Sequence, residues 1–209
     1  MITACLLLKA PREGLVKTRL ALDLGFPRAT AIYRALVERQ LKSLPSEWTV
    51  AIHFAPTDAG SELSHWLRPH LPEGSRFIPQ SEGDLGVRLN TAVHTEFSHG
   101  ARRLFLLGGD CPELNRSYLD DAAAQLDTHD LVLGPAIDGG YVLLGLKAPH
   151  PGLFMKIAWS TSKVLPQTLA AAASLALTTS QLTTLEDVDD LASLKRQTNF
   201  LNEAGIALS

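Results

Sequence analysis

Residues 103–112 have the sequence RLFLLGGDCP and contain the clearest strand signal in the middle of the chain. Four apolar residues follow Arg103, and the run ends abruptly at two glycines and Asp110. Short apolar runs bounded by glycine are typical of buried strands. In open α/β sheets the ligand crevice lies at the carboxyl ends of such strands. We therefore expect Asp110 to lie at a ligand site.

The rest of the chain alternates short apolar runs with amphipathic stretches. Strands are predicted at residues 2–8, 48–54, 76–79, 103–107, 131–134, 141–146 and 175–179. Helices are predicted at residues 27–44, 61–71, 85–97, 117–126, 163–173 and 190–204. This alternation is typical of strands joined by crossover helices in a mostly parallel sheet. Since no repeat or linker divides the sequence, we expect a single domain over residues 1–209.

Composition and charge exclude several classes of protein. The 209 residues are 45% hydrophobic and 20% charged, which is ordinary for a globular domain with a buried core. Lys and Arg total 19 against 22 Asp and Glu, so there is no basic excess to hold a nucleic-acid backbone. Cys5 and Cys111 match no zinc or disulfide spacing, and no apolar run is long enough to span a membrane. We expect a cytoplasmic protein without a nucleic-acid partner.

A basic loop, residues 9–20, follows the first predicted strand. Its sequence, KAPREGLVKTRL, contains four cations, Lys9, Arg12, Lys17 and Arg19. Backbone N–H groups and cationic side chains converge at such a position and can cradle an anionic group. The loop has neither the Walker pattern nor the GxGxxG fingerprint, so a solvated basic surface is the alternative.

Acidic residues follow two of the predicted strands. The carboxylate of Asp110 suits one face of a Mg²⁺ ion whose other ligands are phosphate oxygens and water, although an Asp at this position also forms turns and helix caps. Asp187 and Asp189 belong to a second acidic segment, residues 186–190, ahead of the last predicted helix. Ordinary capping and helix-dipole chemistry is the alternative for that segment.

A turn-rich segment, residues 134–141, separates two predicted strands with the sequence GPAIDGGY. The pair Asp138-Gly139 between two apolar runs predicts a hairpin turn. A turn needs only one Asp-Gly pair, and the continuation Gly140-Tyr141 leaves room for a sugar or a nucleotide against the backbone. Both interpretations remain open from the sequence.

Residues 80–88, QSEGDLGVR, combine polar side chains with the start of a predicted helix. Gln80, Asp84 and Arg88 could read a base edge or a ribose, and they could equally cap the helix. The seven histidines of the chain show no metal-ligand spacing.

The order of these motifs resembles that of a known family. The succession is KxPxxGxxKTRL, QxxGDLGxR, GxDCPEL, GPAxDGGYxLLGL, Trp159-Ser160-Thr161 and DVD. From Lys9 to about Leu194 it is similar to the rSAM/selenodomain-associated transferase 1 family, a family of small bacterial proteins that is also labelled a domain of unknown function. That family looks like a distant relative of the guanylyltransferases of the phospholactate and molybdenum-cofactor pathways.

The resemblance implies a three-layer αβα fold with an open, mostly parallel sheet of the nucleotide-diphospho-sugar transferase (GT-A, Rossmann-like) type. It also implies that Asp110, together with Asp187 or Asp189, holds Mg²⁺ or Mn²⁺. By the same resemblance, phosphates contact Lys9, Arg12, Lys17 and Arg19, the nucleoside contacts Gln80 and Asp84, and the sugar or acceptor contacts Asp138, Gly139, Gly140 and Tyr141. The last motif departs from the family pattern, because Asp190 and Ser193 replace a threonine and a later aspartate, which affects the capping of the last helix.

Three hypotheses about function follow. In glycosyl transfer, a nucleotide-diphospho-sugar donates its sugar, Mg²⁺ stabilises the departing diphosphate, and Asp138 orients the acceptor or acts as the general base. In nucleotidyl transfer, a phosphorylated acceptor attacks the α-phosphate of a nucleoside triphosphate, and pyrophosphate leaves into the basic loop from Lys9 to Arg19, where Lys17 is the candidate catalytic residue. The third hypothesis is a nucleotide-binding protein without catalysis.

Glycosyl transfer is placed ahead of nucleotidyl transfer. Four cations suit a pyrophosphate better than they suit a nucleoside diphosphate, which favours nucleotidyl transfer, whereas the family resemblance favours glycosyl transfer. In both reactions the partners are a nucleotide-activated donor and a small-molecule acceptor. A homodimer is left open by the sequence.

Overall fold

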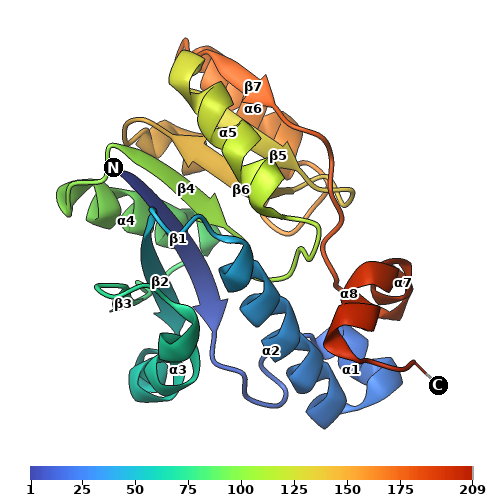
Figure 1. The fold of residues 1–209 in the computed structure, drawn as a ribbon. Coiled ribbons are helices and arrows are strands. Elements are labelled where there is room, and N and C mark those ends of the chain that lie inside the picture. The colour runs from blue at the N-terminus through green and yellow to red at the C-terminus, as the bar shows by residue number, and fades with distance from the viewer. Residues whose placement is uncertain (209) are drawn as a thin grey trace.

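Seven strands form one sheet in the computed structural model, which describes residues 1–208 (Figure 1). The strand order across the sheet is β3-β2-β1-β4-β6-β5-β7. The strands are β1 (Ile2–Lys9), β2 (Thr49–Ala55), β3 (Arg76–Pro79), β4 (Arg103–Leu107), β5 (Leu131–Pro135), β6 (Tyr141–Leu146) and β7 (Thr179–Gln181). β6 runs antiparallel to β4 and β5, and the other pairings of the described sheet are parallel. The expected open, mostly parallel sheet is confirmed.

Helices cover both faces of the sheet. Over the described residues they are α1 (Thr18–Leu24), α2 (Phe26–Ser43), α3 (Gly60–Leu67), α4 (Leu85–Ser98), α5 (Arg116–Thr128), α6 (Val164–Ser174), α7 (Leu191–Arg196) and α8 (Thr198–Ala204), with short 3-10 helices η1 (Thr57–Ala59), η2 (Arg68–His70) and η3 (Pro151–Phe154). Apolar side chains of α2, α3 and α5 share a core with one face, and those of α4 and α6 share a core with the other (Figure 1). The three-layer αβα architecture is confirmed. No helix in this described part of the chain is long and apolar enough to cross a membrane.

The central strands read as continuous apolar runs because both of their faces are covered. In β1, Ala4, Cys5 and Leu6 are fully buried. In β4, Phe105 is fully buried and stacks on Trp48, with ring centroids 5.0 Å apart. Since β1 and β4 are parallel neighbours, their carboxyl ends lie at the same edge of the sheet.

The structure differs from the sequence prediction in three places. α1 forms inside the stretch predicted as a long charged loop. The helix predicted at residues 190–204 is divided into α7 and α8 because Gln197, with φ −86° and ψ 56°, leaves the helical region. The strand predicted at residues 175–179 is wrong for most of its length, because Ala176 turns the chain with φ 54° and β7 begins only at Thr179.

Asp190 and Ser193, the two residues that depart from the family pattern, form the N-terminal cap of α7. Asp190 Oδ1 accepts a hydrogen bond from Ser193 N at 2.8 Å, and Ser193 Oγ accepts one from Asp190 N at 3.1 Å. This reciprocal arrangement is a capping box at the start of α7. Ser193 Oγ also accepts a hydrogen bond from Asp189 N at 3.0 Å, so the cap fixes the backbone of a candidate metal ligand.

A buried charged network ties β2 and β3 to α4. His53 Nε2 lies 2.8 Å from Glu96 Oε1, and Arg76 pairs with Glu96 Oε2. The Glu96 side chain is fully covered. Burial raises the pKa of Glu96, but the hydrogen bonds from His53 and Arg76 outweigh it, so the pKa lies below its usual value. The network fixes α4, whose N-terminal end carries Asp84.

We expect Glu96→Ala to leave the buried His53 and the partly buried Arg76 without their carboxylate. Removing one partner of a buried ion pair costs about 3–5 kcal/mol, so the free energy of unfolding, measured by urea denaturation, should fall by that order. Glu47→Ala is the matched control, because it removes an exposed pair with Arg116 and should cost less than about 1 kcal/mol. Equal losses in the two variants would show that the network does not stabilise the fold.

Candidate metal and nucleotide site

A cleft of about 670 Å³ opens at the edge where the carboxyl ends of β1 and β4 meet. β1 leads from this edge through the basic loop to α1 (Figure 1). The cleft is lined by residues 7–9, 15–19, 108–110 and 160–162, and by Tyr33, Asp138 and Asp189. Open α/β sheets bind their ligands at this edge, and the volume is typical of a small-molecule pocket.

Three acidic side chains meet beside the cleft, and two of them, Asp110 and Asp189, line it. Asp110 follows β4, whereas Asp187 and Asp189 follow β7. A backbone hydrogen bond of 2.9 Å from Val188 N to Asp110 O joins the two segments. Each of the three acids offers one carboxylate oxygen, and these oxygens lie within 4.8 Å of one another. We call Asp110, Asp187 and Asp189 the acidic cluster.

The acidic cluster has the donor atoms and the electrostatics of a divalent-cation site. Burial, followed by the carboxylates of Asp110, Asp189 and Asp138, raises the pKa of Asp187 to about 7. Such an excess of negative charge favours a bound cation, and oxygen ligands are those that Mg²⁺ and Mn²⁺ prefer. The residues present therefore fit the metal ion that the motifs predict.

Lys17 contacts the acidic cluster directly. Its Nζ lies 2.8 Å from Asp110 Oδ2 and 3.3 Å from Asp189 Oδ1, and its side chain is 6% exposed. Lys17 precedes α1 in the left-handed conformation, with φ 45° and ψ 45°. Burial lowers the pKa of Lys17, but the carboxylates of Asp110 and Asp189 raise it by more than burial lowers it. The net shift of the pKa is upward, so the amine is charged. When Asp187 is ionised, Lys17 and Arg19 together balance two of the three carboxylates, which leaves the cluster negative.

The other cations of the basic loop point in two directions. Lys9 and Arg19 line the cleft, and Arg19 Nη1 lies 3.4 Å from Asp189 Oδ2. Arg12 instead pairs with Glu62 of α3 at 2.9 Å and is not among the lining residues. The structure therefore brings three of the four predicted phosphate-binding cations, including Lys17, to the cleft.

Gln80 and Asp84, the residues predicted to face the nucleoside, have partners within the protein. Gln80 Nε2 donates hydrogen bonds to His53 O at 2.8 Å and to Leu8 O at 3.3 Å, which ties the end of β3 to β2 and β1. Asp84 Oδ1 accepts a hydrogen bond from Val87 N at 2.9 Å and caps α4. Neither residue lines the cleft, and their contact with a nucleoside stays a prediction.

The turn between β5 and β6 presents Asp138 to the cleft. Asp138 Oδ1 accepts a hydrogen bond from Gly140 N at 2.8 Å, which holds the carboxylate in place. Gly139 has φ 89°, and a Cβ there would come within 2.6 Å of the Ser162 backbone, so the position excludes a side chain. Leu165 N donates to Gly139 O at 2.9 Å and anchors the turn on α6. This segment is therefore both a strand-to-strand turn and a wall of the cleft.

Two parts of the cleft have no role in the sequence prediction. Tyr33 Oη accepts a hydrogen bond from Lys9 N at 3.1 Å and donates one to Lys9 O at 3.0 Å, so it fixes the start of the basic loop. Its place in a predicted helix gives no signal for this contact. Residues 160–162 line the cleft as well. The Trp159-Ser160-Thr161 motif was the available signal for that segment.

A second hollow of about 280 Å³ adjoins the cleft. The two share Leu7, Gly108, Asp138 and residues 160–161. Apolar and aromatic residues supply most of the lining, namely Leu7, Leu85, Leu89, Leu106, Leu107, Ala136, Tyr141, Val142, Trp159 and Val164. We call this space the apolar hollow. Gly140 and Tyr141, predicted to face the sugar or acceptor, line it together with Asp187.

Comparison with known families finds a match over more than half of the chain. The family model described as "Uncharacterized protein conserved in bacteria (DUF2064)" matches residues 40–161. A search of curated proteins finds no significant match to the chain. The family match confirms the resemblance to a bacterial family of unknown function that the order of the motifs indicates.

Comparison with solved structures identifies the type of fold. The chain is similar to a Desulfovibrio desulfuricans protein provisionally described as a nucleotide-diphospho-sugar transferase, with 26% identity, 97% of each chain covered and a TM-score of 0.83. It shares its fold with the inositol-1-phosphate CTP transferase of T. maritima, at 14% identity, 99% and 97% coverage and a TM-score of 0.57. It also shares its fold with Rv0371c of Mycobacterium tuberculosis, solved as a complex with manganese, at 16% identity, 93% and 96% coverage and a TM-score of 0.54. The expected nucleotide-diphospho-sugar transferase fold is confirmed.

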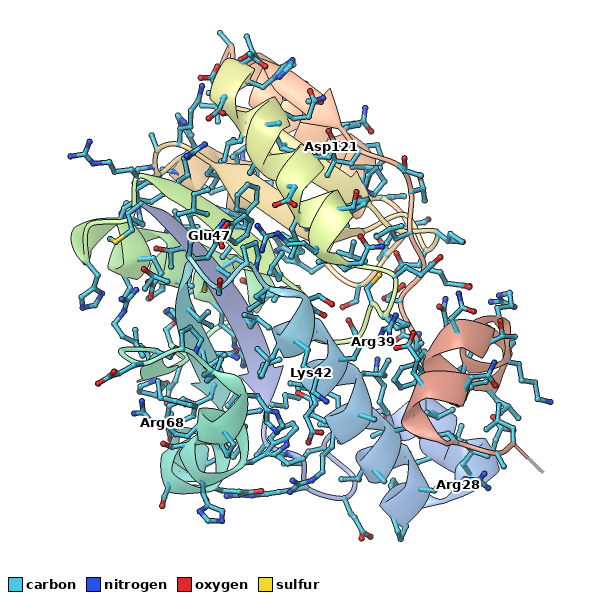
Figure 2. The ribbon with its side chains drawn as sticks, in the orientation of Figure 1. Arg28, Arg39, Lys42, Glu47, Arg68 and Asp121 are labelled. Atoms are coloured by element: carbon cyan, nitrogen blue, oxygen red, sulfur yellow. The ribbon has the colours of Figure 1, made fainter. Side chains whose placement is uncertain are left out.

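We expect the protein to bind Mn²⁺, and Asp110→Asn and Asp187→Asn each to weaken binding by at least about tenfold, because each removes one charged oxygen ligand. Isothermal titration calorimetry with Mn²⁺ measures the affinity. Asp121→Asn is the matched control, because Asp121 is an exposed acid of α5 on one face of the sheet (Figure 2). Unchanged Mn²⁺ affinity in both cluster variants would contradict the assignment.

Proposed function

We propose that this chain, which belongs to the DUF2064 family of bacterial proteins and has the fold of a nucleotide-diphospho-sugar transferase, is a metal-dependent transferase that uses a nucleotide-activated donor. One observation carries the proposal: the acidic cluster and three cations of the basic loop line or border a single cleft. A nucleotide donor needs both the acidic cluster and the cations, because its phosphates bind a divalent cation and cationic side chains together.

Each group in the cleft has a defined task in this proposal. The acidic cluster holds Mg²⁺ or Mn²⁺, which when bound supplies positive charge where phosphate oxygens gain negative charge. Lys9 and Arg19 bind phosphate oxygens from the basic loop. Lys17 lies between the loop and the cluster, so its ammonium can donate to a phosphate oxygen bound beside the carboxylates.

Glycosyl transfer is the reaction we place first. The acceptor oxygen forms a bond to the anomeric carbon of the donor while the bond from that carbon to the diphosphate breaks, and the electron pair leaves with the diphosphate. Asp138 orients the acceptor hydroxyl or takes its proton, because the turn between β5 and β6 holds it at the cleft. Lys17 and Arg19 stabilise the charge on the departing diphosphate.

Nucleotidyl transfer is the second candidate, and the cations of the basic loop favour it. An acceptor phosphate would attack the α-phosphate of a nucleoside triphosphate, and pyrophosphate would leave toward Lys17. However, Arg12 pairs with Glu62 of α3, so fewer cations face the leaving group than the sequence indicates. This pairing reduces the support for a triphosphate donor.

Analysis of the products separates the two reactions. The protein is incubated with Mn²⁺ and a panel of nucleotide-sugars and nucleoside triphosphates, with water as a slow acceptor, and the released nucleoside diphosphate and pyrophosphate are quantified. We expect nucleoside diphosphate from a nucleotide-sugar. Pyrophosphate from a triphosphate would establish the second candidate instead. Neither product from any donor would contradict a transferase of this type.

Lys17→Met removes the ammonium while keeping the side chain long and unbranched. Hydrogen bonds to charged groups contribute about 1.5–3 kcal/mol, so we expect the affinity for a nucleoside diphosphate with Mn²⁺ to fall by at least about tenfold in calorimetric titration. Lys42→Met, at an exposed position of α2, is the matched control and should bind as the wild type does (Figure 2). If the Lys17 variant also retained full affinity, Lys17 would not belong to the phosphate site.

A further inference from the structure

We propose that the apolar hollow binds the body of the acceptor, and that this acceptor is an uncharged alcohol with an aromatic or aliphatic skeleton. The inference rests on the proposed function, because it takes the adjoining cleft as the donor site. The Asp138 carboxylate lies at the boundary between the two spaces and would meet the acceptor hydroxyl.

The walls of the hollow offer apolar surface from several elements. Leu85, in the first turn of α4, is 41% exposed, whereas Leu89 is 7% exposed. The indole Nε1 of Trp159 lies against α4, so close that a Cβ on Gly86 would come within 2.7 Å of it. The hydroxyl of Tyr141 is covered, so Tyr141 offers the hollow its ring and not a hydrogen-bonding group. Trp159 and Tyr141 therefore contribute mainly ring surface.

This lining disfavours a sugar or another polyol. Asp138, Asp187, Ser160 and Thr161 can pair with some hydroxyls of such a ligand, but its other hydroxyls would lie against leucine and valine side chains without hydrogen-bond partners. A buried polar group without a partner costs free energy, and the cost is repeated for each hydroxyl. An apolar body loses no hydrogen bonds there and removes its own surface from water.

The charges around the hollow disfavour an anionic acceptor body. Of the described residues that line it, only Asp138 and Asp187 carry charge, and both are acids. Lys9, Lys17 and Arg19 line the cleft and not the hollow. The metal ion that we propose at the acidic cluster offsets the charge of Asp187. A carboxylate or phosphate on the acceptor body would still lie near Asp138 with no lysine or arginine in the described lining beside it, and like charges oppose binding. The acceptor body is therefore uncharged.

The size of the hollow suits a ring with a short side chain. Its volume of about 280 Å³ is nearly twice the roughly 150 Å³ of a cavity that takes up one benzene molecule. A hydroxyl on the side chain then lies at Asp138. In the transfer step the hydroxyl oxygen bonds to the anomeric carbon, the bond from that carbon to the diphosphate oxygen breaks with its electron pair, and the proton passes to Asp138.

Binding of three probes to the full-length chain tests the inference without turnover. 2-Phenylethanol is an uncharged aryl alcohol, phenylacetate has the same ring with an anionic group, and myo-inositol is an uncharged polyol. Each is titrated in the presence of the diamagnetic ion Mg²⁺ and followed by saturation-transfer NMR of the ligand. We expect 2-phenylethanol to bind at least about tenfold more tightly than either of the other two.

A charge placed at the hollow should change this selectivity. Leu85→Lys adds a cation at a side chain that is 41% exposed, so the fold should tolerate it. We expect the affinity ratio of 2-phenylethanol to phenylacetate to fall by at least about tenfold. Leu22→Lys makes the same change on α1, where the side chain is 86% exposed, and should keep the wild-type ratio. A change in selectivity is a readout that mere loss of structure would not give.

Two results would overturn the inference. One is phenylacetate or myo-inositol binding as tightly as 2-phenylethanol, and the other is an unchanged affinity ratio in Leu85→Lys. Mn²⁺ and a nucleoside diphosphate are titrated separately on the same protein. Donor binding without 2-phenylethanol binding would overturn this inference alone. Binding of 2-phenylethanol without donor binding would overturn the proposed function and, with it, the acceptor role of the hollow.

Discussion

The charge balance between Lys17 and the acidic cluster is the interaction on which the rest of the site depends. Lys17 Nζ lies 2.8 Å from Asp110 Oδ2, yet burial and the neighbouring carboxylates still raise the pKa of Asp187 to about 7. The carboxylates come from the segments after β4 and β7, and the ammonium comes from the residue before α1. The ion pairs of Lys17 with Asp110 and Asp189 therefore hold three distant parts of the chain together at one edge of the sheet. Because the cluster remains negative, a bound cation would stabilise this arrangement further.

The two spaces at this edge differ in chemistry and meet at one carboxylate. The cleft contains cations and acids, as a phosphate-bearing ligand with a metal ion requires, whereas the adjoining hollow is mainly apolar. Asp138 borders both, and its turn is held on α6 by the hydrogen bond from Leu165 N to Gly139 O. A carboxylate held by the Gly140 N hydrogen bond between a charged space and an apolar one can separate the donor from the acceptor and still contact both. This arrangement links the proposed reaction to the proposed acceptor class.

The sequence predicts most of the fold because the signals for its elements are local. Long apolar runs identify the central strands, since both faces of the sheet are covered, whereas β7 has only three polar residues and is misplaced. The order of the motifs predicts that Asp110 lies at the site. It does not predict the directions of Arg12 and Gln80, because their partners, Glu62 and the carbonyl of His53, come from distant segments. Local patterns contain no information about such contacts, so three-dimensional structure is needed to find them.

Joint binding of a divalent cation and a nucleotide-activated donor is tested most directly by thermal denaturation with ligands. A ligand that binds only the native state stabilises it by about 2.7 kcal/mol at roughly 100 times its Kd, which raises the midpoint by several degrees in a chain of this size. We expect nucleotide-sugars or nucleoside triphosphates to raise the midpoint only when Mg²⁺ or Mn²⁺ is present. An equal rise with and without the metal ion, or no rise with any donor, would contradict the account.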